Sequence, residues 1–280
     1  MRPAPPVRDL LCQTMTVITH TPQELAEAIG RTDTLALVPT MGALHDGHLS
    51  LVREARTAGG PVVVSIFVNP LQFAPGEGLE AYPRTLGEDV EKLEAEGVEA
   101  VFAPSAATMY PAGPRTTVQP GELGRVLEGA SRPTHFAGVL TVVGKLFALT
   151  GATDAYFGEK DYQQLVLIRQ MVEDLNMPVR VHGCPIVRED AGLTLSSRNR
   201  YLSEAEHATA LTLSRALATG SYEGARSLLD AHPGVDLDYL ALRTPGLEEL
   251  PAGYRGPARL LVAARVGTTR LIDNVEVTVG

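Results

Sequence analysis

Residues 38–48 have the sequence VPTMGALHDGH and join two segments of different character. The apolar run Leu35–Leu37 before them predicts a short buried strand, and the amphipathic run after them predicts a helix. His45 and His48, on either side of Gly47, would therefore lie where a helix begins. The first N–H groups of a helix lack internal partners and carry a partial positive charge. A phosphate can bind there, with the imidazoles as further donors and the glycine allowing a close approach.

For either histidine alone, a polar residue on a strand-to-helix loop is the simpler interpretation. Thr40, Gly42, His45, Gly47 and His48 occur together and in this order, however, and the combination favours phosphate chemistry. A phosphate site of this kind at a helix N-terminus suits many nucleotide enzymes, so it does not identify the reaction by itself.

Strand and helix patterns alternate along most of the chain. Helical patterns at Thr85–Glu96 and Tyr162–Leu175 separate runs that are continuously apolar. This alternation predicts an α/β fold, a Rossmann-like parallel sheet with helices on both faces. Ligands of such folds bind beyond the carboxyl ends of the strands. The strand-like runs are Leu35–Val38, Val62–Val68, Ala100–Ala103, Asp154–Phe157 and Val179–His182.

The pattern changes after about residue 190. The capping box Ser203–Glu206 begins a helix. Leu260–Val266 and Arg270–Val279, joined by a Gly-Thr-Thr turn, predict a terminal β-hairpin. These features predict a smaller C-terminal α+β domain.

We therefore expect three parts. Residues 1–14 contain three prolines and are expected to be a disordered leader, with Met15 as an alternative start. Residues 15–188 would form the Rossmann-like domain that binds ATP and its co-substrate, and residues 189–280 the smaller domain, acting as a lid.

Composition and charge argue against several classes of function. The formal charge of −9 and the pI near 5.3 disfavour binding to duplex nucleic acid, which needs a basic face. No apolar run has the length of a membrane span. Cys12 and Cys184 lie far apart and lack metal-ligand spacing, so we expect reduced thiols and a cytoplasmic location.

Two further motifs follow predicted strands. Asn69 and Gln72 carry amides that donate and accept, which suits a small substrate with hydroxyls and a carboxylate; considered alone, however, an Asn-Pro turn with incidental amides is the better explanation. In the second motif, Lys160 would neutralise a phosphate, and Asp161 would accept from ribose hydroxyls or cap the next helix. Gln164 would share the helical face of Asp161.

Three other candidates are weaker in isolation. Ser196, Ser197 and Arg198 suit a pyrophosphate clamp or, alternatively, a polar linker between domains. Arg132, in an expected glycine-bounded loop over residues 129–139, would pair with a substrate carboxylate, and an exposed structural arginine is an equal alternative. Asp89 would lie near a bound magnesium ion, but an acidic first turn of a helix explains it better.

Together these motifs resemble the pantoate–β-alanine ligase (pantothenate synthetase) family, within the HxGH nucleotidyltransferase superfamily. An HxGH motif alone is weak evidence, whereas the full set, in order from Met15 to Val277, is highly specific. Leu195 departs from the family, which usually has Met there. The matching segments are 39–48, 67–73, 82–84, 132–139, 157–164, 196–199 and 263–274.

The resemblance implies a two-step reaction. The pantoate carboxylate attacks the α-phosphorus of ATP to give pantoyl adenylate and pyrophosphate, and the amine of β-alanine then displaces AMP. It also implies Mg²⁺ bound with ATP, a homodimer, and no nucleic-acid or membrane partner. His48, His45 and Lys160 would be catalytic, with His48 the family's proton donor. ATP would contact Met41, Gly42, His45, Gly47, His48, Gly158, Glu159, Lys160, Asp161, Val187, Leu195, Ser196, Ser197 and Arg198; pantoate or β-alanine would contact Gln72 and Gln164, with Asn69 and Arg132 as helpers.

Two competing interpretations stay open at this point. An adenylyl- or cytidylyltransferase shares the HxGH helix. Its phosphorylated acceptor would require more cationic residues, however, and the neutral amides Gln72 and Gln164 disfavour it. A non-catalytic nucleotide- or RNA-binding module is disfavoured by the acidity and by the complete motif set.

Overall fold

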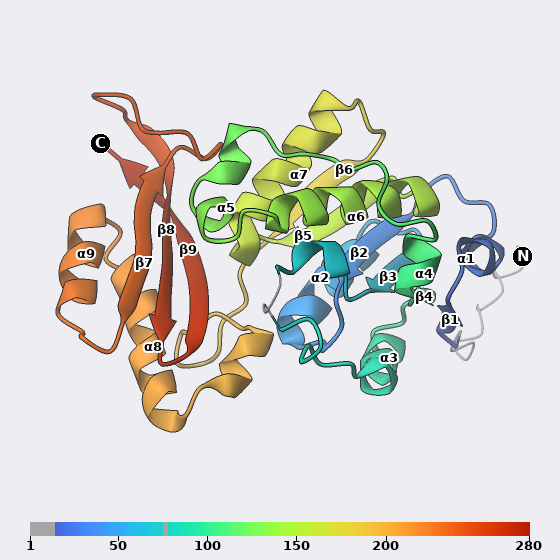
Figure 1. Cartoon of the computed structure of the whole chain (residues 1–280), viewed down its shortest axis with the longest axis horizontal. Coiled ribbons are helices and arrows are strands. Elements are labelled where there is room, and N and C mark those ends of the chain that lie inside the picture. The colour runs from blue at the N-terminus through green and yellow to red at the C-terminus, as the bar shows by residue number, and fades with distance from the viewer. Residues whose placement is uncertain (1–14, 75–77) are drawn as a thin grey trace, which may run out of the picture.

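The computed structural model describes residues 15–74 and 78–280, so the leader expected at 1–14 lies outside the described residues. The first sheet has six strands in the order β1-β4-β3-β2-β5-β6, and every neighbouring pair is parallel. From β2 the chain builds outward through β3 and β4, then returns to add β5 and β6 on the other side of β2 (Figure 1). The strands are β1 Val17–Thr19, β2 Ala36–Thr40, β3 Val62–Ile66, β4 Ala100–Phe102, β5 Asp154–Gly158 and β6 Arg180–Cys184.

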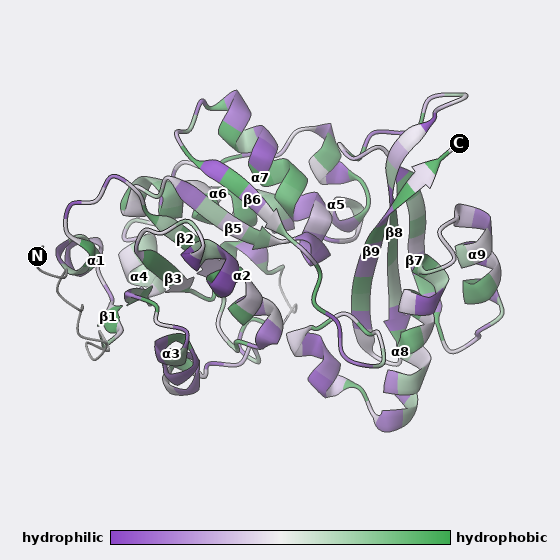
Figure 2. Cartoon of the chain, turned by 180° about the vertical axis from the view of Figure 1, so that it is seen from behind, coloured by the Kyte–Doolittle hydropathy of each residue, from purple (hydrophilic) through white to green (hydrophobic). Residues whose placement is uncertain are grey.

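Helices cover both faces of this sheet, which confirms the predicted fold class. One apolar layer contains α1 (Pro22–Ile29), α6 (His135–Thr150) and α7 (Tyr162–Asp174). The opposite layer contains α2 (Asp46–Arg56) and α3 (Leu86–Ala95). Because both faces are covered, the central strands are mostly apolar, and Figure 2 shows β3 as hydrophobic and the outer helix α3 as largely hydrophilic.

The prediction of a loop over residues 129–139 is wrong for most of this segment. It consists of the short helix α5 (Glu128–Ser131) and the beginning of α6 at His135. Its glycines serve close packing, since a Cβ on Gly138 would lie 2.3 Å from the Leu71 carbonyl oxygen and one on Gly129 would lie 2.0 Å from that of Gly124. The short strand β1 and the short helix α4 (Ala106–Met109) were also not predicted.

The second sheet has three antiparallel strands, β7 (Asp236–Arg243), β8 (Gly256–Val266) and β9 (Thr269–Val279). The expected hairpin is β8 and β9, and β7 adds a third strand. α8 (Glu204–Leu217) and α9 (Tyr222–Asp230) pack on one face, towards Leu260, Val262 and Ala264.

The other face of the second sheet packs against the first part of the chain. Leu261 belongs to the core of the parallel sheet, while its neighbours Leu260 and Val262 belong to the core under α8 and α9. β8 is therefore buried on both faces, which explains an apolar run without the usual alternation. Within the described ranges, no helix is long and apolar enough to cross a membrane.

Candidate functional site

A cavity of about 520 Å³ lies between the carboxyl edge of the first sheet and the second sheet. This size suits a small-molecule ligand. Segments that follow β2, β3 and β5 line one side, and Leu261, Ile272, Asp273 and Asn274 line the other. The predicted site residues that line it are Met41, His45, Gly47, His48, Gln72, Arg132, Gly158, Lys160, Asp161, Gln164, Val187, Leu195, Ser196, Ser197 and Arg198.

The two histidines form the N-terminus of α2. His45 is the N-cap residue, and its Nδ1 accepts from the N–H of Gly47 at 3.2 Å. Nδ1 of His48 accepts from the N–H of His45 at 3.3 Å, and the two ring centroids lie 4.1 Å apart. Because both Nδ1 atoms accept, the proton of each neutral ring is on Nε2. Both side chains are thereby prepared to donate a hydrogen bond.

Burial keeps both imidazoles neutral. Burial, the neighbouring His45 and Lys160 lower the pKa of His48 to about 3. Burial and Lys160 also lower the pKa of His45. Both rings are consequently neutral donors near pH 7, rather than cations.

This lowered pKa predicts a loss of stability in acid. An unfolded histidine takes up a proton below its ordinary pKa of 6.5, whereas folded His48 does so only near 3. The neutral His48 therefore leaves the free energy of unfolding unaffected above pH 6.5. As the pH falls from 6.5 towards 3, the free energy of unfolding decreases, and the loss amounts to about 2 kcal/mol by pH 5. Urea denaturation at pH 7 and pH 5 measures it. The free energy of unfolding should fall less in His48→Gln than in the parent chain, and equal losses would contradict the prediction.

Asp89 lies in the first turn of α3, as the favoured interpretation predicted, and its side chain holds the turn before the histidines. Its carboxylate is fully buried and accepts from the N–H groups of Ala43 at 2.9 Å and Leu44 at 2.7 Å. Gly42 and Ala43 both have positive φ in this turn. Gly42 does not line the cavity, and its contribution is the turn itself.

Asn69 lies behind Gln72 and does not line the cavity, so its expected direct contact with substrate is not supported. Its side chain is 1% exposed, and its Nδ2 donates to Gln72 Oε1 and to the carbonyl of Gly138, each at 3.1 Å. The Gln72 amide also donates to Met41 Sδ at 3.0 Å. His135 Nδ1 contacts the Gln72 carbonyl at 3.1 Å, and its Nε2 contacts Arg132 at 3.0 Å. Gln72 is thus fixed from several sides.

Lys160 and Asp161 line the cavity in the turn between β5 and α7. Lys160 Nζ lies 3.5 Å from Asp161 Oδ2. The side chain of Asp161 is 49% exposed; desolvation inside the cavity opposes its charged form, but Lys160 and Arg198 outweigh that effect and lower its pKa. Asp161 makes no side-chain cap to α7, contrary to one expectation. Glu159 does not line the cavity and instead pairs with Arg259 of β8 at 3.3 Å.

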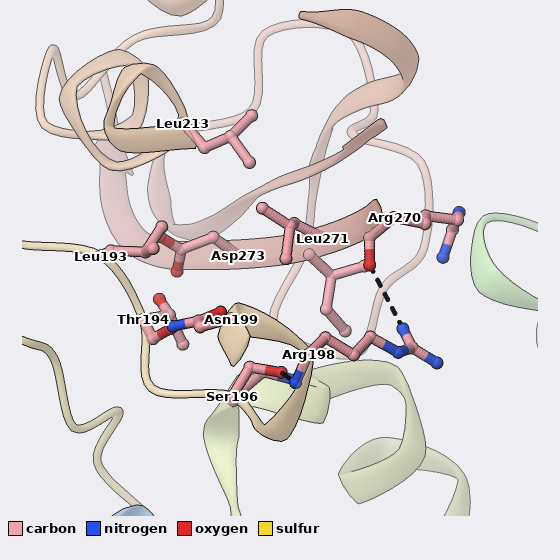
Figure 3. A pocket seen from close by; sticks show the side chains of 11 residues that line it. Leu193, Thr194, Ser196, Arg198, Asn199, Leu213, Arg270, Leu271 and Asp273 are labelled. Carbon is pink, nitrogen blue, oxygen red and sulfur yellow. Dashed lines mark hydrogen bonds between the residues drawn. The ribbon is translucent and has the colours of Figure 1, made fainter. Parts of the chain in front are cut away.

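Arg188 and Thr194 form an isolated antiparallel bridge that closes the turn between them, and the chain then brings the segment Leu195 to Arg198 to the cavity, where the 3-10 helix Ser197–Tyr201 begins. Leu195 packs close to Gly47, 3.8 Å from where a Cβ on that glycine would lie. Arg198 Nη1 donates to the Arg270 carbonyl at 3.4 Å, beside a second cavity of about 10 Å³ shown in Figure 3. Burial and Arg132 lower the pKa of Arg198, whose guanidinium nevertheless stays charged.

The cavity also has an apolar wall that was not predicted from the sequence. It comes from one face of α6 and includes Phe136, Val139, Val142, Val143 and Leu146. These residues belong to a helix that is buried on most sides, and the glycine at position 138 suggested a loop instead. Asn274 and Asp273 were also unassigned, although they belong to the terminal motif.

Comparison with known proteins gives a consistent result. The family model for pantoate-beta-alanine ligase matches residues 13–276. Pantothenate synthetase of Corynebacterium jeikeium is 65% identical over 257 residues, 88% of this chain and 83% of that protein. That of Nocardia farcinica is 63% identical over 262 residues, 90% of this chain and 81% of that protein.

Solved structures agree with these relatives. The crystal structure of pantothenate synthetase from Thermus thermophilus has a TM-score of 0.88 and 47% identity, covering 93% of this chain and 99% of that one. Pantoate-beta-alanine ligase from Francisella tularensis, complexed with beta-gamma ATP and beta-alanine, has a TM-score of 0.82 and 35% identity, covering 93% and 97%. This chain belongs to the pantoate–β-alanine ligase family.

Proposed function

We propose that this chain condenses pantoate with β-alanine, using ATP, to give pantothenate, AMP and pyrophosphate through a pantoyl-adenylate intermediate. The observation that carries the proposal is a single cavity lined by two groups of hydrogen-bond donors, each suited to a different substrate. The neutral histidines, Lys160 and Arg198 suit phosphates, and the amides Gln72 and Gln164 suit a small hydroxy acid.

In the first step, the pantoate carboxylate attacks the α-phosphorus of ATP, and pyrophosphate leaves. Negative charge grows on the phosphate oxygens, so positioning and preorganised donors supply most of the catalysis. His45 and His48 donate from Nε2, since each Nδ1 already accepts from the backbone. Lys160 and Arg198 add positive charge, and Ser196 and Ser197 add hydroxyl donors.

In the second step, the amine of β-alanine attacks the mixed anhydride, and AMP leaves. Gln72 and Gln164 hold the pantoyl group, with Asn69 orienting Gln72 from behind. Residues 189–280 act as a lid over the nucleotide and limit the access of water to the anhydride.

We assign Mg²⁺ to the ATP phosphates rather than to a protein cage. Among residues 15–74 and 78–280, no group of three His, Cys, Asp or Glu side chains is placed to hold a metal ion. Mg²⁺ that arrives with ATP needs few protein ligands, and it would neutralise phosphate charge. We also propose a homodimer in the cytoplasm, on the family resemblance; sedimentation of the purified protein tests the dimer.

Exchange of labelled pyrophosphate into ATP tests the reaction directly. We expect exchange that requires pantoate, and AMP release that requires pantoate and β-alanine together. Exchange with a phosphorylated acceptor and none with pantoate would instead indicate a nucleotidyltransferase.

Gln72→Leu should raise the KM for pantoate by roughly 10-fold or more, because a buried site that hydrogen-bonds a hydroxyl is left without its donor. The KM for ATP should change much less. Steady-state kinetics with each substrate varied separately distinguishes the two, and an equal rise in both constants would contradict the assignment.

A further inference from the structure

The terminal motif contains a polar pair, Asp273 and Asn274, that contacts both ATP-binding segments. Both side chains are buried, at 3% and 2% exposure, in the middle of β9. A buried polar group is costly unless it is fully hydrogen-bonded. Neither residue has a role in the reaction described above.

Asn274 holds the segment that carries Lys160. Its Nδ2 donates to the carbonyl of Glu159 at 2.9 Å and to that of Lys160 at 3.0 Å. Its Oδ1 accepts from Arg259 at 3.3 Å, and the Arg259 guanidinium lies 3.9 Å from the centre of the Tyr162 ring. Both amide hydrogens are therefore committed to fixing the backbone at Lys160.

Asp273 holds the other segment. Its carboxylate pairs with Arg188 through two contacts, 2.6 Å to Nη1 and 2.9 Å to Nη2. Arg188 Nη1 also donates to the Gly192 carbonyl at 3.1 Å and to Thr194 Oγ1 at 3.0 Å. Arg188 thus closes the turn that precedes the segment Leu195 to Arg198, and Figure 3 shows Asp273 on β9 beside Thr194 and Asn199, which flank that segment.

We propose that Asp273 and Asn274 are positioning residues: one dipeptide of the second sheet sets the positions of Lys160 and of the 195–198 segment relative to each other. Both segments contact the same triphosphate, so the position of one segment relative to the other matters more than the position of either alone. A misplacement of about 1 Å at an active site costs roughly 100-fold in rate. The inference rests on the proposed function, because it assigns those two segments to ATP.

The two residues should have different kinetic signatures. Asn274→Ala frees the Lys160 backbone and should lower the rate of pantoate-dependent pyrophosphate exchange by about 100-fold. Asp273→Asn weakens the pairing with Arg188 that holds the 195–198 segment in place. It should raise the KM for ATP by roughly 10-fold, with less effect on kcat. Glu276→Gln, at an exposed position further along the same strand, is the matched control and should behave like the parent.

The half-reactions separate positioning from loss of folding. With prepared pantoyl adenylate, Asn274→Ala should react with β-alanine at a rate within a few-fold of the parent, because pyrophosphate has already left and only the α-phosphate remains in the intermediate. Equal slowing of both half-reactions would overturn the proposal.

A double-mutant cycle completes the test. If Asn274 acts through Lys160, Asn274→Ala should cost little more once Lys160→Met is present. Full additivity of the two losses would overturn the proposal. Parent protein that shows no pantoate-dependent exchange would refute the proposed function itself, which is a different result.

Discussion

His48→Ala is expected to lower the rate of adenylate formation by roughly 10²–10³-fold, the usual loss when a preorganised donor to developing negative charge is removed. The ring is half-buried at the start of α2, where it lines the cavity, and its Nδ1 is occupied by the N–H of His45. Only Nε2–H is then left to donate to a ligand. Pyrophosphate exchange measures the rate, and thermal unfolding measures the accompanying loss of stability, which should be small by comparison.

His48→Gln is the informative control. Glutamine keeps an N–H donor and an accepting oxygen but cannot titrate. A neutral hydrogen-bond role therefore predicts that Gln recovers much of the activity lost in Ala. Proton donation by His48 predicts that Gln and Ala are equally inactive, and that result would replace the neutral-donor assignment. The pKa of about 3 favours the first outcome.

The sequence predicted the edge of the sheet where the site lies, because strand and helix periodicity determines where each strand ends. It could not predict which side chains at that edge face the cavity. Asn69 and Asp89 show why: each is a polar residue in a promising motif, yet each is turned inward to satisfy backbone or amide groups. Those partners are distant in sequence, and a linear pattern does not contain them.

α6 illustrates a second limit. It is buried almost all round, so its apolar residues do not form the single stripe that marks an amphipathic helix. Gly138 then suggests a loop, although the close approach of the Leu71 backbone is what requires a glycine. The contacts of Asp273 and Asn274 could not be predicted either, because their partners lie 85 and 115 residues away in the chain.

Lys160→Met should produce a loss comparable to that of His48→Ala, and the reason is electrostatic. The ammonium group lies in the same cavity as both histidines and lowers the pKa of each. Removing it takes away a positive charge that the developing phosphate charge would meet, so exchange should fall by roughly 10²–10³-fold. Lys160→Arg should recover part of the rate, since it keeps the charge but not the compact ammonium geometry.

The same substitution has a second expected signature that a structural effect would not give. Without Lys160, the pKa values of His45 and His48 should both rise towards the ordinary value, because one of the charges that lowers them is gone. Titration of the imidazole signals by NMR measures this in the parent, in Lys160→Met and in Lys160→Arg. An upward shift in Met but not in Arg would place the charge beside the rings in solution. Unchanged titration in Lys160→Met, together with a large loss of rate, would mean that Lys160 acts on ATP from a position too far away to affect the histidine pKa values. The assignment of Lys160, His45 and His48 to the same phosphates would then have to be abandoned.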